Sequence, residues 1–442
     1  MTARRVAFDV IDDVDSRDSY ANLLLPKRIT AAGLTQQDAA LATQLTYGTL
    51  RWRGQYDAVI EALAERSLEQ IDSDVVTALR LGLHQLARTR VAGHAAVHET
   101  VELLSPRARG KRGFVNALLR RVSKEGFDTV LEGVLAVLEG DEAAAVRTSH
   151  PAWVIRAFRR ALAAEGAEGE LETLLEADNV PAGVHLVALP GLAEQDELDG
   201  ATTASPIGAE LRGGDPARHP LVADRRARVQ DSGSQLAALA LSRLEPVKAG
   251  ERWLDLCAGP GGKAALLAAE AALHGATLVA NEMLPHRAKL VRQSTTQFDI
   301  DVLTGDGRRF AGSDGEFDRV LLDAPCTGLG ALRRRPESRW RKQAGDVGPL
   351  STLQEELLEA ALAAVRPGGI VAYVTCSPHL AETNQVIQRA LRSGRAEAID
   401  TEPVLHSIAA ELAPARRGTA AQLWPHRHGT DAMFIQLMRR AR

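Results

Sequence analysis

All three cysteines of this 442-residue chain lie in short motifs within one stretch of the sequence. Cys257 stands in Leu-Asp-Leu-Cys-Ala-Gly-Pro-Gly-Gly-Lys, Cys326 in Leu-Asp-Ala-Pro-Cys-Thr-Gly, and Cys376 in Tyr-Val-Thr-Cys-Ser-Pro. The first motif is a glycine-rich turn of the kind that receives a nucleotide-like cofactor at a helix start. The other two place thiols just past predicted buried strands. Two such thiols beside a nucleotide loop indicate covalent chemistry on a substrate.

Methylation of carbon 5 of a pyrimidine is one reaction that needs such a pair, because that carbon is not nucleophilic by itself. A thiolate that adds to carbon 6 turns the ring into an enamine, and a base later removes the proton from carbon 5. A free thiol is only a few per cent ionised at pH 7, so its surroundings must help. A lone buried cysteine is usually an inert core residue, whereas two thiols at strand ends favour catalysis.

The spacing of the glycine-rich loop and the acids that follow it narrows the choice of cofactor. The loop reads G-x-G-G from Gly259, which differs from the G-x-G-x-x-G of dinucleotide sites, and the sequence contains no phosphate-binding P-loop. Glu282 ends the next predicted strand, where its carboxylate can accept both hydroxyls of a ribose. Asp306 follows the strand after that, near the expected adenine. A loop and two acids in this order favour S-adenosylmethionine over NAD.

These motifs need a sheet to position them, and strands alternate with helices from Val229 onward. Ligands of doubly wound parallel sheets bind beyond the carboxyl ends of the strands, where each motif falls. The expected strands are 252–256, 278–282, 301–304, 317–322 and 369–374, and the expected helices are 264–273, a segment ending at Arg292, 352–365 and 382–391.

The first part of the chain has a different pattern, with apolar residues at three- and four-residue spacing that predict helices and no strand. Thr35, followed by Asp38, marks a plausible helix start. A strand is expected at 184–190, inside a segment punctuated by glycine and proline. The predicted domains are therefore helical (1–125), a helical linker with a small mixed domain (126–225), and an α/β catalytic domain (226–442).

Composition excludes several classes of protein. Three cysteines without a pairing pattern indicate a reducing cytosol. The N-terminus lacks the apolar core of a signal peptide, and no apolar run approaches the roughly 20 residues that span a bilayer. We therefore expect a cytoplasmic protein with no membrane partner. The net charge is −4, so any binding of nucleic acid must come from local basic clusters.

The motifs resemble those of the RNA cytosine-5 methyltransferases of the RsmB/Sun (NOL1/NOP2) type. The resemblance covers the three cysteine motifs, Arg-Arg-Arg-Pro-Glu-Ser-Arg-Trp after Cys326, and Val-Gln-Asp-Ser-Gly-Ser-Gln before the catalytic domain. The first 125 residues, which end in Gly-Phe-Val-Asn-Ala-Leu-Leu-Arg-Arg, resemble the NusB-type helical RNA-binding domain. The resemblance is weakest at 166–225, where His185-Leu186-Val187 replaces the usual Arg-Val-Asn.

The resemblance implies a role for each matching residue. Cys376 would be the nucleophile at carbon 6, Cys326 the base or the group that assists product release, and Asp323 a residue that touches the cytosine. The residues implied to hold S-adenosylmethionine are Cys257, Ala258, Gly259, Pro260, Gly261, Gly262, Lys263, Glu282, Asp306 and Asp323. The arginines expected to grip RNA phosphates are Arg333, Arg334, Arg335, Arg339 and Arg341.

The function implied is methylation of carbon 5 of a cytidine in 16S ribosomal RNA. Two alternatives stay open, namely the same chemistry on transfer RNA and an inert RNA-binding or antitermination protein. No metal is expected, because His426 and His428 have no third or fourth ligand at a matching spacing. The sequence leaves the modified cytidine and the oligomeric state undefined.

Overall fold

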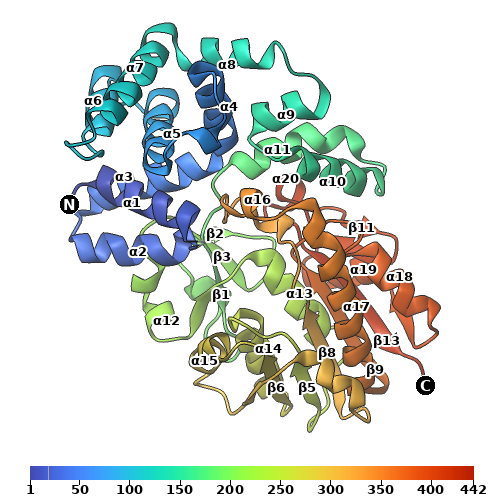
Figure 1. Ribbon diagram of the computed structural model, residues 1–442. Helices are drawn as coiled ribbons and strands as arrows, with labels where there is room; N and C mark the ends of the chain where they lie inside the picture. The colour runs from blue at the N-terminus through green and yellow to red at the C-terminus, as the bar shows by residue number, and fades with distance from the viewer. Residues whose placement is uncertain (18) are drawn as a thin grey trace. The chain divides into compact units, whose positions relative to one another are not determined.

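The computed structural model describes residues 1–17 and 19–442, which form two compact units (Figure 1). Unit 1 consists of residues 1–156 together with 332–341, and unit 2 consists of 157–331 and 342–442. The three domains expected from the sequence had boundaries at 125 and 225, and those boundaries stay predictions. No described helix is long and apolar enough to cross a membrane.

Unit 1 is helical, as the sequence pattern predicts. Its helices are α1 (Ala3–Ser16), α2 (Ala21–Ala32), α3 (Gln36–Arg51), α4 (Arg53–Ala64), α5 (Ser73–Arg88), α6 (Gly93–Val101), α7 (Arg109–Glu125), α8 (Phe127–Leu135), α9 (Gly140–Thr148), the start of α10 (Ala152–Ala163), and α16 (Ser338–Arg341). Thr35 caps α3 by accepting a hydrogen bond from the Asp38 N–H, as expected. Helix α5 is the central helix, and apolar residues such as Leu79 and Leu83 are fully buried in the core.

Unit 2 begins inside α10 and continues with the whole of α11 (Leu171–Asn179). A small antiparallel sheet with strand order β2-β3-β1-β4 follows. Its strands are β1 (His185–Ala188), β2 (Gly200–Thr202), β3 (Gly208–Leu211) and β4 (Ala227–Val229), with α12 (Pro220–Ala223) before the last. The expected strand at 184–190 is thus β1, one of the two inner strands of this antiparallel sheet.

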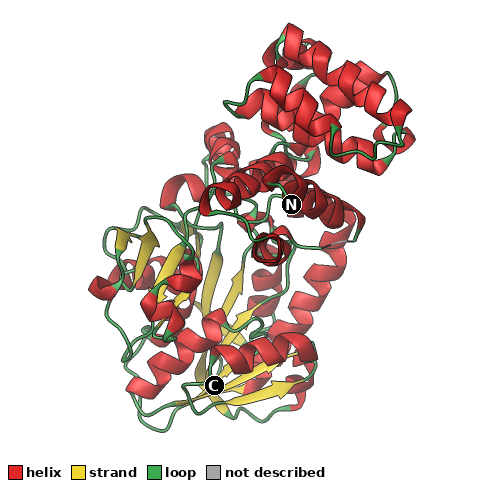
Figure 2. Cartoon of the chain, turned by 90° about the vertical axis from the view of Figure 1, so that its left-hand side faces the viewer, coloured by secondary structure: helices red, strands yellow, loops and turns green. Residues whose placement is uncertain are grey.

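The main sheet of unit 2 contains the expected parallel strands in the order β9-β8-β5-β6-β7. Figure 2 shows the strands of this unit in yellow among the red helices. They are β5 (Arg252–Asp255), β6 (Thr277–Glu282), β7 (Asp301–Thr304), β8 (Phe317–Asp323) and β9 (Val365–Thr375). The helices are α13 (Ser232–Ser242), α14 (Gly262–Leu273), α15 (Pro285–Ser294), α17 (Val347–Ala364), α18 (Asn384–Arg392) and α19 (Thr401–Ile408). The expected α/β fold of the second part is confirmed.

The sheet also has an antiparallel part, which the sequence pattern did not predict. Strand β13 (Phe434–Arg440) lies antiparallel beside β9 and pairs with β12 (Ala420–Gln422) and β10 (Ala396–Ile399). Strand β12 in turn pairs with β11 (Arg416–Arg417), and the four-residue helix α20 (Pro425–His428) precedes β13.

Neighbouring residues of the central strands pack into two different cores, because successive side chains of a strand point to opposite faces. In β8, Leu321 packs in the core that contains α13, α14 and α19, whereas Leu322 packs in the core with α17 and α18. Both faces of the sheet are therefore covered, and the free positions for polar chemistry are the strand ends. The carboxyl ends of β5, β6, β8 and β9 carry the motif residues.

Arg319, near the start of β8, links this strand to Glu251 and to the end of α13. Its side chain is 2% exposed, pairs with Glu251 at 2.8 Å, and donates hydrogen bonds to the carbonyls of Leu241 and Ser242 at the end of α13. Although burial opposes ionisation, the hydrogen bonds from Arg319, the Lys248 N–H and Trp253 lower the pKa of Glu251.

We expect Arg319→Leu to destabilise the chain by about 3 kcal/mol, because it leaves the Glu251 carboxylate buried without its cation. A urea titration followed by tryptophan fluorescence measures the loss. The matched control is Arg366→Leu, which removes a pair with Asp318 whose arginine side chain is 47% exposed, and it should cost no more than about 1 kcal/mol. Equal losses in the two variants would contradict this assignment.

Candidate active site

The glycine-rich loop lies between β5 and α14 and approaches other backbone and side-chain atoms closely. Gly261 has φ +107°, and a Cβ atom there would lie 2.6 Å from the Cβ of Ser294. A Cβ on Gly259 would lie 2.1 Å from Oε2 of Glu282. Gly261 therefore excludes a larger side chain, whereas a side chain at Gly259 would have to displace the Glu282 carboxylate. The loop leads directly into the first turn of α14, whose N–H groups can bind a ligand.

The two acids predicted to bind the cofactor are Glu282, at the end of β6, and Asp306, after β7. The Glu282 carboxylate accepts hydrogen bonds from the N–H groups of Gly259 at 3.1 Å and Leu284 at 2.9 Å. Asn281 links the strand ends, because its amide donates to the carbonyls of Leu256 and Gly305. Asp306 follows directly on the segment that Asn281 holds.

Asp306 is engaged by a neighbouring cation. Its carboxylate accepts hydrogen bonds from the Arg308 side chain and backbone, and these lower the pKa of Asp306. Arg308 also pairs with Glu356 at 2.9 Å. A ligand that needs the Asp306 carboxylate would have to share it with Arg308.

Lys263 and Asp323 form an ion pair at the centre of the site. The Lys263 Nζ lies 2.8 Å from the Asp323 carboxylate, and the lysine side chain is only 10% exposed. Burial alone would lower the pKa of Lys263, but the charge and hydrogen bond of Asp323 raise it. The lysine therefore carries a fixed positive charge among the strand ends.

Asp255, the last residue of β5, is a site residue that the sequence reasoning missed. It is 1% exposed, and burial together with the Asp323 charge raises its pKa to about 8 in spite of the nearby Lys263. A cation that enters the site would favour its ionised form. The available signal was an acid at the end of an otherwise apolar strand inside the first cysteine motif.

The two thiols predicted to act together do meet. The Sγ atoms of Cys326 and Cys376 are 3.5 Å apart, and both residues are partly buried. The hydrogen bond with Cys376 and burial raise the pKa of the Cys326 thiol well above its ordinary value. Cys257 is a different case, because burial and the surrounding acids raise its pKa and keep it protonated. Cys257 can contribute its backbone to the loop, but not a nucleophile.

The arginines after Cys326 are placed differently from the expectation. Arg339 is fully buried in unit 1, where it donates hydrogen bonds to the carbonyls of Arg51 and Ser149, and Arg333 is 8% exposed with its carbonyl bound to the Arg51 side chain. The expectation that Arg333 and Arg339 grip RNA is corrected, because both side chains are inside the helical unit.

The three remaining arginines of this cluster are less buried. Arg335 is exposed, and Arg334 and Arg341 are half-buried. The guanidinium groups of Arg335 and Arg341 lie over the ring of Tyr20. These three arginines stay candidates for contact with RNA.

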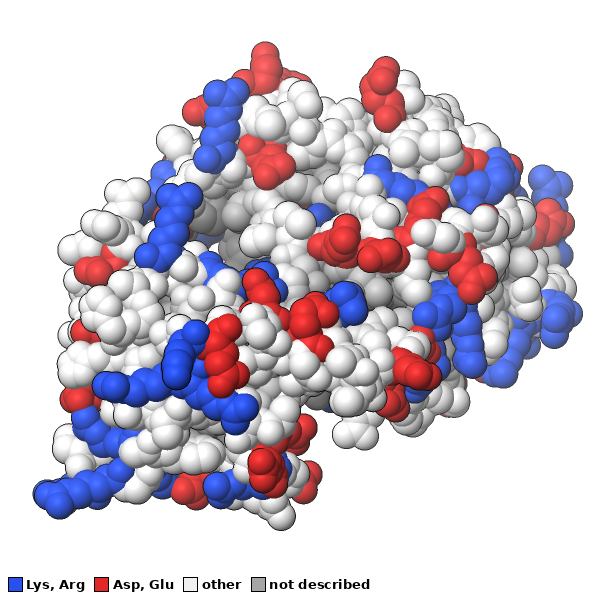
Figure 3. Space-filling view, turned by 90° about the horizontal axis from the view of Figure 1, so that it is seen from above, with Lys and Arg blue, Asp and Glu red and all other residues white. Residues whose placement is uncertain are grey.

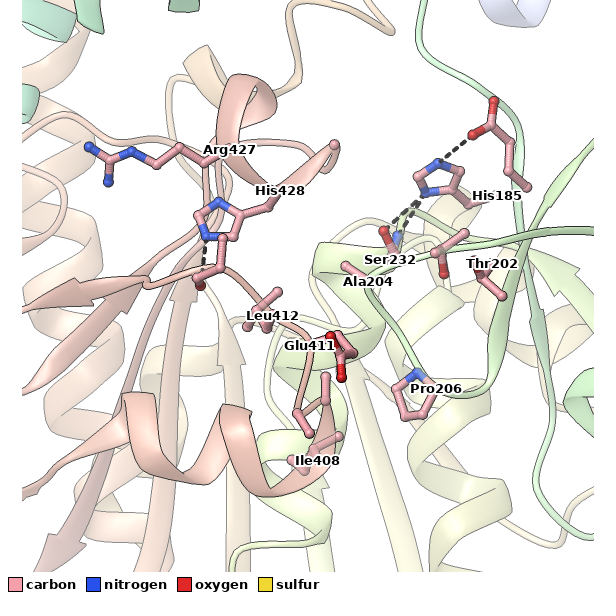
Figure 4. A pocket seen from close by; sticks show the side chains of 16 residues that line it. His185, Thr202, Ala204, Pro206, Ser232, Ile408, Glu411, Leu412, Arg427 and His428 are labelled. Atoms are coloured by element: carbon pink, nitrogen blue, oxygen red, sulfur yellow. Dashed lines mark hydrogen bonds and ion pairs between the residues drawn. The ribbon is translucent and has the colours of Figure 1, made fainter. Parts of the chain in front are cut away.

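The C-terminal histidines make contacts within unit 2. The Nε2 of His426 lies 2.7 Å from the Glu170 carboxylate, and His428 hydrogen-bonds the backbone of Trp424 and Ala413. His428 also lines a cavity of about 540 Å³, between the small sheet and residues 408–413 (Figure 4). His185 faces this cavity and contacts Ser232. Neither of the paired thiols lines it.

Comparisons with known proteins show the family to which the chain belongs. A family model described as "16S rRNA methyltransferase RsmB/F" matches residues 241–439, and the NusB family model matches residues 1–124. A ribosomal RNA small subunit methyltransferase B from Pseudomonas putida (strain KT2440) is 35% identical over 88% of this chain and 88% of its own. The chain belongs to the RsmB/F methyltransferase family.

Further relatives agree with this placement. A Mycobacterium tuberculosis (strain H37Rv) protein, described only as a candidate methyltransferase, is 49% identical over 99% of this chain and 96% of its own. The crystal structure of PH0851 superposes with a TM-score of 0.78 over 99% of both chains at 21% identity, which shows the shared fold. As a member of the family, the chain is an RNA methyltransferase that uses S-adenosylmethionine.

The residues present fit this cofactor. The glycine loop offers a close-fitting backbone, the Glu282 carboxylate at this loop can accept ribose hydroxyls, and Asp323, with Asp255 once a cation favours its ionised form, would face a ligand with ammonium and sulfonium groups. S-adenosylmethionine carries the electrophilic methyl group that the reaction needs.

Asp255→Asn is expected to remove a pH dependence of stability. An aspartate titrates near about pH 3.9 when unfolded, so the folded chain, with a pKa of about 8, keeps a proton that the unfolded chain has lost. The free energy of unfolding therefore falls as pH rises between these values, by at most about 1.4 kcal/mol per pH unit. Urea titrations at several pH values should show that the free energy of unfolding of Asp255→Asn increases relative to that of the wild type as pH rises. Parallel curves would contradict the raised pKa.

Proposed function

We propose that the chain methylates carbon 5 of a cytidine in 16S ribosomal RNA through a covalent bond between Cys376 and carbon 6 of the base. The observation that carries the proposal is the pair of thiols 3.5 Å apart beside the Lys263–Asp323 ion pair. A methyltransferase acting on nitrogen or oxygen has no need of two adjacent thiols. The 16S substrate rests on the names of the family model and of the relatives.

The first step falls to Cys376 and its neighbours. The Cys376 thiolate adds to carbon 6, forming an S–C bond and making carbon 5 nucleophilic toward the methyl group of the cofactor. The Lys263 ammonium supplies positive charge near the thiolate, and we assign Asp323 to the ring edge of the cytosine. Because both are mostly buried, their charges are weakly screened by water.

Release of the product needs a base, and Cys326 is the nearest candidate. In the adduct Cys326 first releases its thiol proton to solvent, and the resulting thiolate takes the proton from carbon 5, while the electron pair left behind re-forms the C5–C6 double bond and expels the Cys376 thiolate. Cys326 thereby returns to the neutral thiol and Cys376 to the thiolate, which regenerates the enzyme. This order assigns different roles to two chemically identical side chains.

RNA contact is expected from local groups of basic residues. On the face seen in Figure 3, Lys and Arg are interspersed with Asp and Glu, in keeping with the net charge of −4. Arg335 is exposed in unit 1, whereas Arg120 and Arg121 on α7 are exposed at a second place in the same unit. Such contacts bind phosphates and orient the RNA without reading its sequence.

Alanine variants of the cysteines test the roles. We expect Cys376→Ala to reduce transfer of labelled methyl groups to 16S RNA by at least about a thousandfold, because no other thiol lies at the expected position. Cys326→Ala should accumulate an RNA–protein adduct stable to denaturing gel electrophoresis, since the base is missing. Full activity of Cys376→Ala would overturn the nucleophile assignment.

Two controls sharpen this experiment. Cys257→Ala removes a buried thiol that takes no part in the pair, and it should form no trapped adduct. The double variant Cys326→Ala/Cys376→Ala should form none either, because the adduct needs Cys376. Transfer RNA serves as the alternative substrate, and labelling of transfer RNA alone would keep the chemistry and refute the 16S assignment.

A further inference from the structure

Glu382 is a fully buried acid in the segment between β9 and α18. Its Oε1 accepts hydrogen bonds from the Thr327 N–H at 2.8 Å and from Nε2 of Gln354 at 3.2 Å. Its Oε2 accepts hydrogen bonds from the hydroxyls of Thr327 at 2.5 Å and Ser377 at 2.6 Å. Each carboxylate oxygen therefore receives two hydrogen bonds, which offsets the cost of burying the group.

The donors to this carboxylate are the residues that follow the two reactive thiols. Thr327 comes directly after Cys326, and Ser377 comes directly after Cys376. Gln354 on α17 adds a third tie, because its amide also donates to the carbonyl of Pro325. One buried carboxylate thus joins two loops that come from the ends of different strands.

We propose that Glu382 is a positioning residue that holds the Cys326 and Cys376 loops together and so fixes the separation of the two thiols. The inference rests on the proposed function and adds to it the group that sets the geometry of the thiol pair. Glu382 acts through Thr327 and Ser377 and need not touch the substrate.

The same carboxylate gives the two thiols different electrostatic surroundings. The groups that hydrogen-bond Glu382 are a backbone N–H, two hydroxyls and an amide, all of them uncharged. Its charge is one of the contributions that raise the pKa of Cys326, after the hydrogen bond with Cys376 and burial. Cys376, in contrast, interacts with the Lys263 ammonium. Cys326 therefore stays a neutral thiol in the free enzyme while Cys376 attacks.

Formation of the bond between Cys376 and carbon 6 makes the Cys326 thiol easier to ionise. Once the Cys376 sulfur is bonded to carbon 6, it no longer carries a charge that opposes ionisation of Cys326. The pKa of Cys326 then falls toward a value at which it can accept the carbon-5 proton. The order of the two thiols would then follow from the charge of Glu382 acting on Cys326 and the charge of Lys263 acting on Cys376.

Glu382→Gln separates charge from shape, because the amide is nearly isosteric and the hydroxyls of Thr327 and Ser377 can accept from it. We expect the pH profile for alkylation of Cys326 by iodoacetamide to move down by about one unit, which is about a tenfold faster reaction at neutral pH. Mass spectrometry of the peptide containing Cys326 measures the rate. Glu270→Gln is the matched control, since Glu270 is a buried acid of α14 bound to Ser242 and Arg243, and it should not move the profile.

Glu382→Ala removes the shape as well. Crosslinking of Cys326 to Cys376 by a bifunctional thiol reagent should fall severalfold in this variant and persist in Glu382→Gln. Circular dichroism checks that each variant is folded. Unchanged crosslinking in Glu382→Ala and an unchanged alkylation profile in Glu382→Gln would each overturn the role of Glu382.

The thiol assays need no RNA, so they separate the two proposals. If Glu382→Gln shifts the Cys326 profile but the wild type methylates no cytidine, the positioning role stands and the proposed function fails. If the wild type forms the RNA adduct and neither Glu382 variant changes the thiols, the proposed function stands and the positioning role fails.

Discussion

Two thiols in van der Waals contact cannot both be anions, and the site is built around this constraint. Like charges 3.5 Å apart repel strongly where water is scarce, so identical side chains must be made different by what surrounds them. The fold provides the difference through the strand that precedes each thiol. Cys376 follows β9 and interacts with the Lys263 ammonium, whereas Cys326 follows β8 and its pKa is raised in part by the Glu382 charge.

The sheet makes this arrangement possible because its strand ends are rigid and adjacent. Strands β8 and β9 run parallel, with Leu322 beside Tyr373 and Asp323 beside Val374, so residues just beyond them reach the same edge. Helices cover both faces of the sheet, so the polar groups are confined to this edge. Asp255 is buried there and the side chains of Lys263 and Asp323 are mostly buried, so each charge influences its neighbours strongly.

Much of this was predictable from local sequence, because the parallel strands are short apolar runs that end in distinctive motifs. The strand positions, the helical first part and the meeting of Cys326 with Cys376 all follow from such patterns. The antiparallel strands β10 to β12 were missed, since segments such as Ala420–Gln422 are too short to show a period. Glu382 was missed because nothing near it in sequence indicates that Thr327 and Gln354 bind it. The prediction that Arg339 binds RNA was wrong because a run of basic residues has the same sequence pattern whether its side chains face solvent or bind backbone carbonyls.

The discontinuity of unit 1 bears on how the chain folds during synthesis. Residues 332–341 belong to this unit, where Glu337 binds the Ala21 N–H and the Trp340 ring lies against Gly54 and beneath the Arg53 guanidinium. A ribosome that has made only the first 156 residues has therefore produced a helical unit that lacks one of its parts. The missing part arrives directly after the Cys326 loop and the strands before it. Completion of the helical unit thus waits for translation of much of the catalytic unit, which ties the maturation of the two together in time.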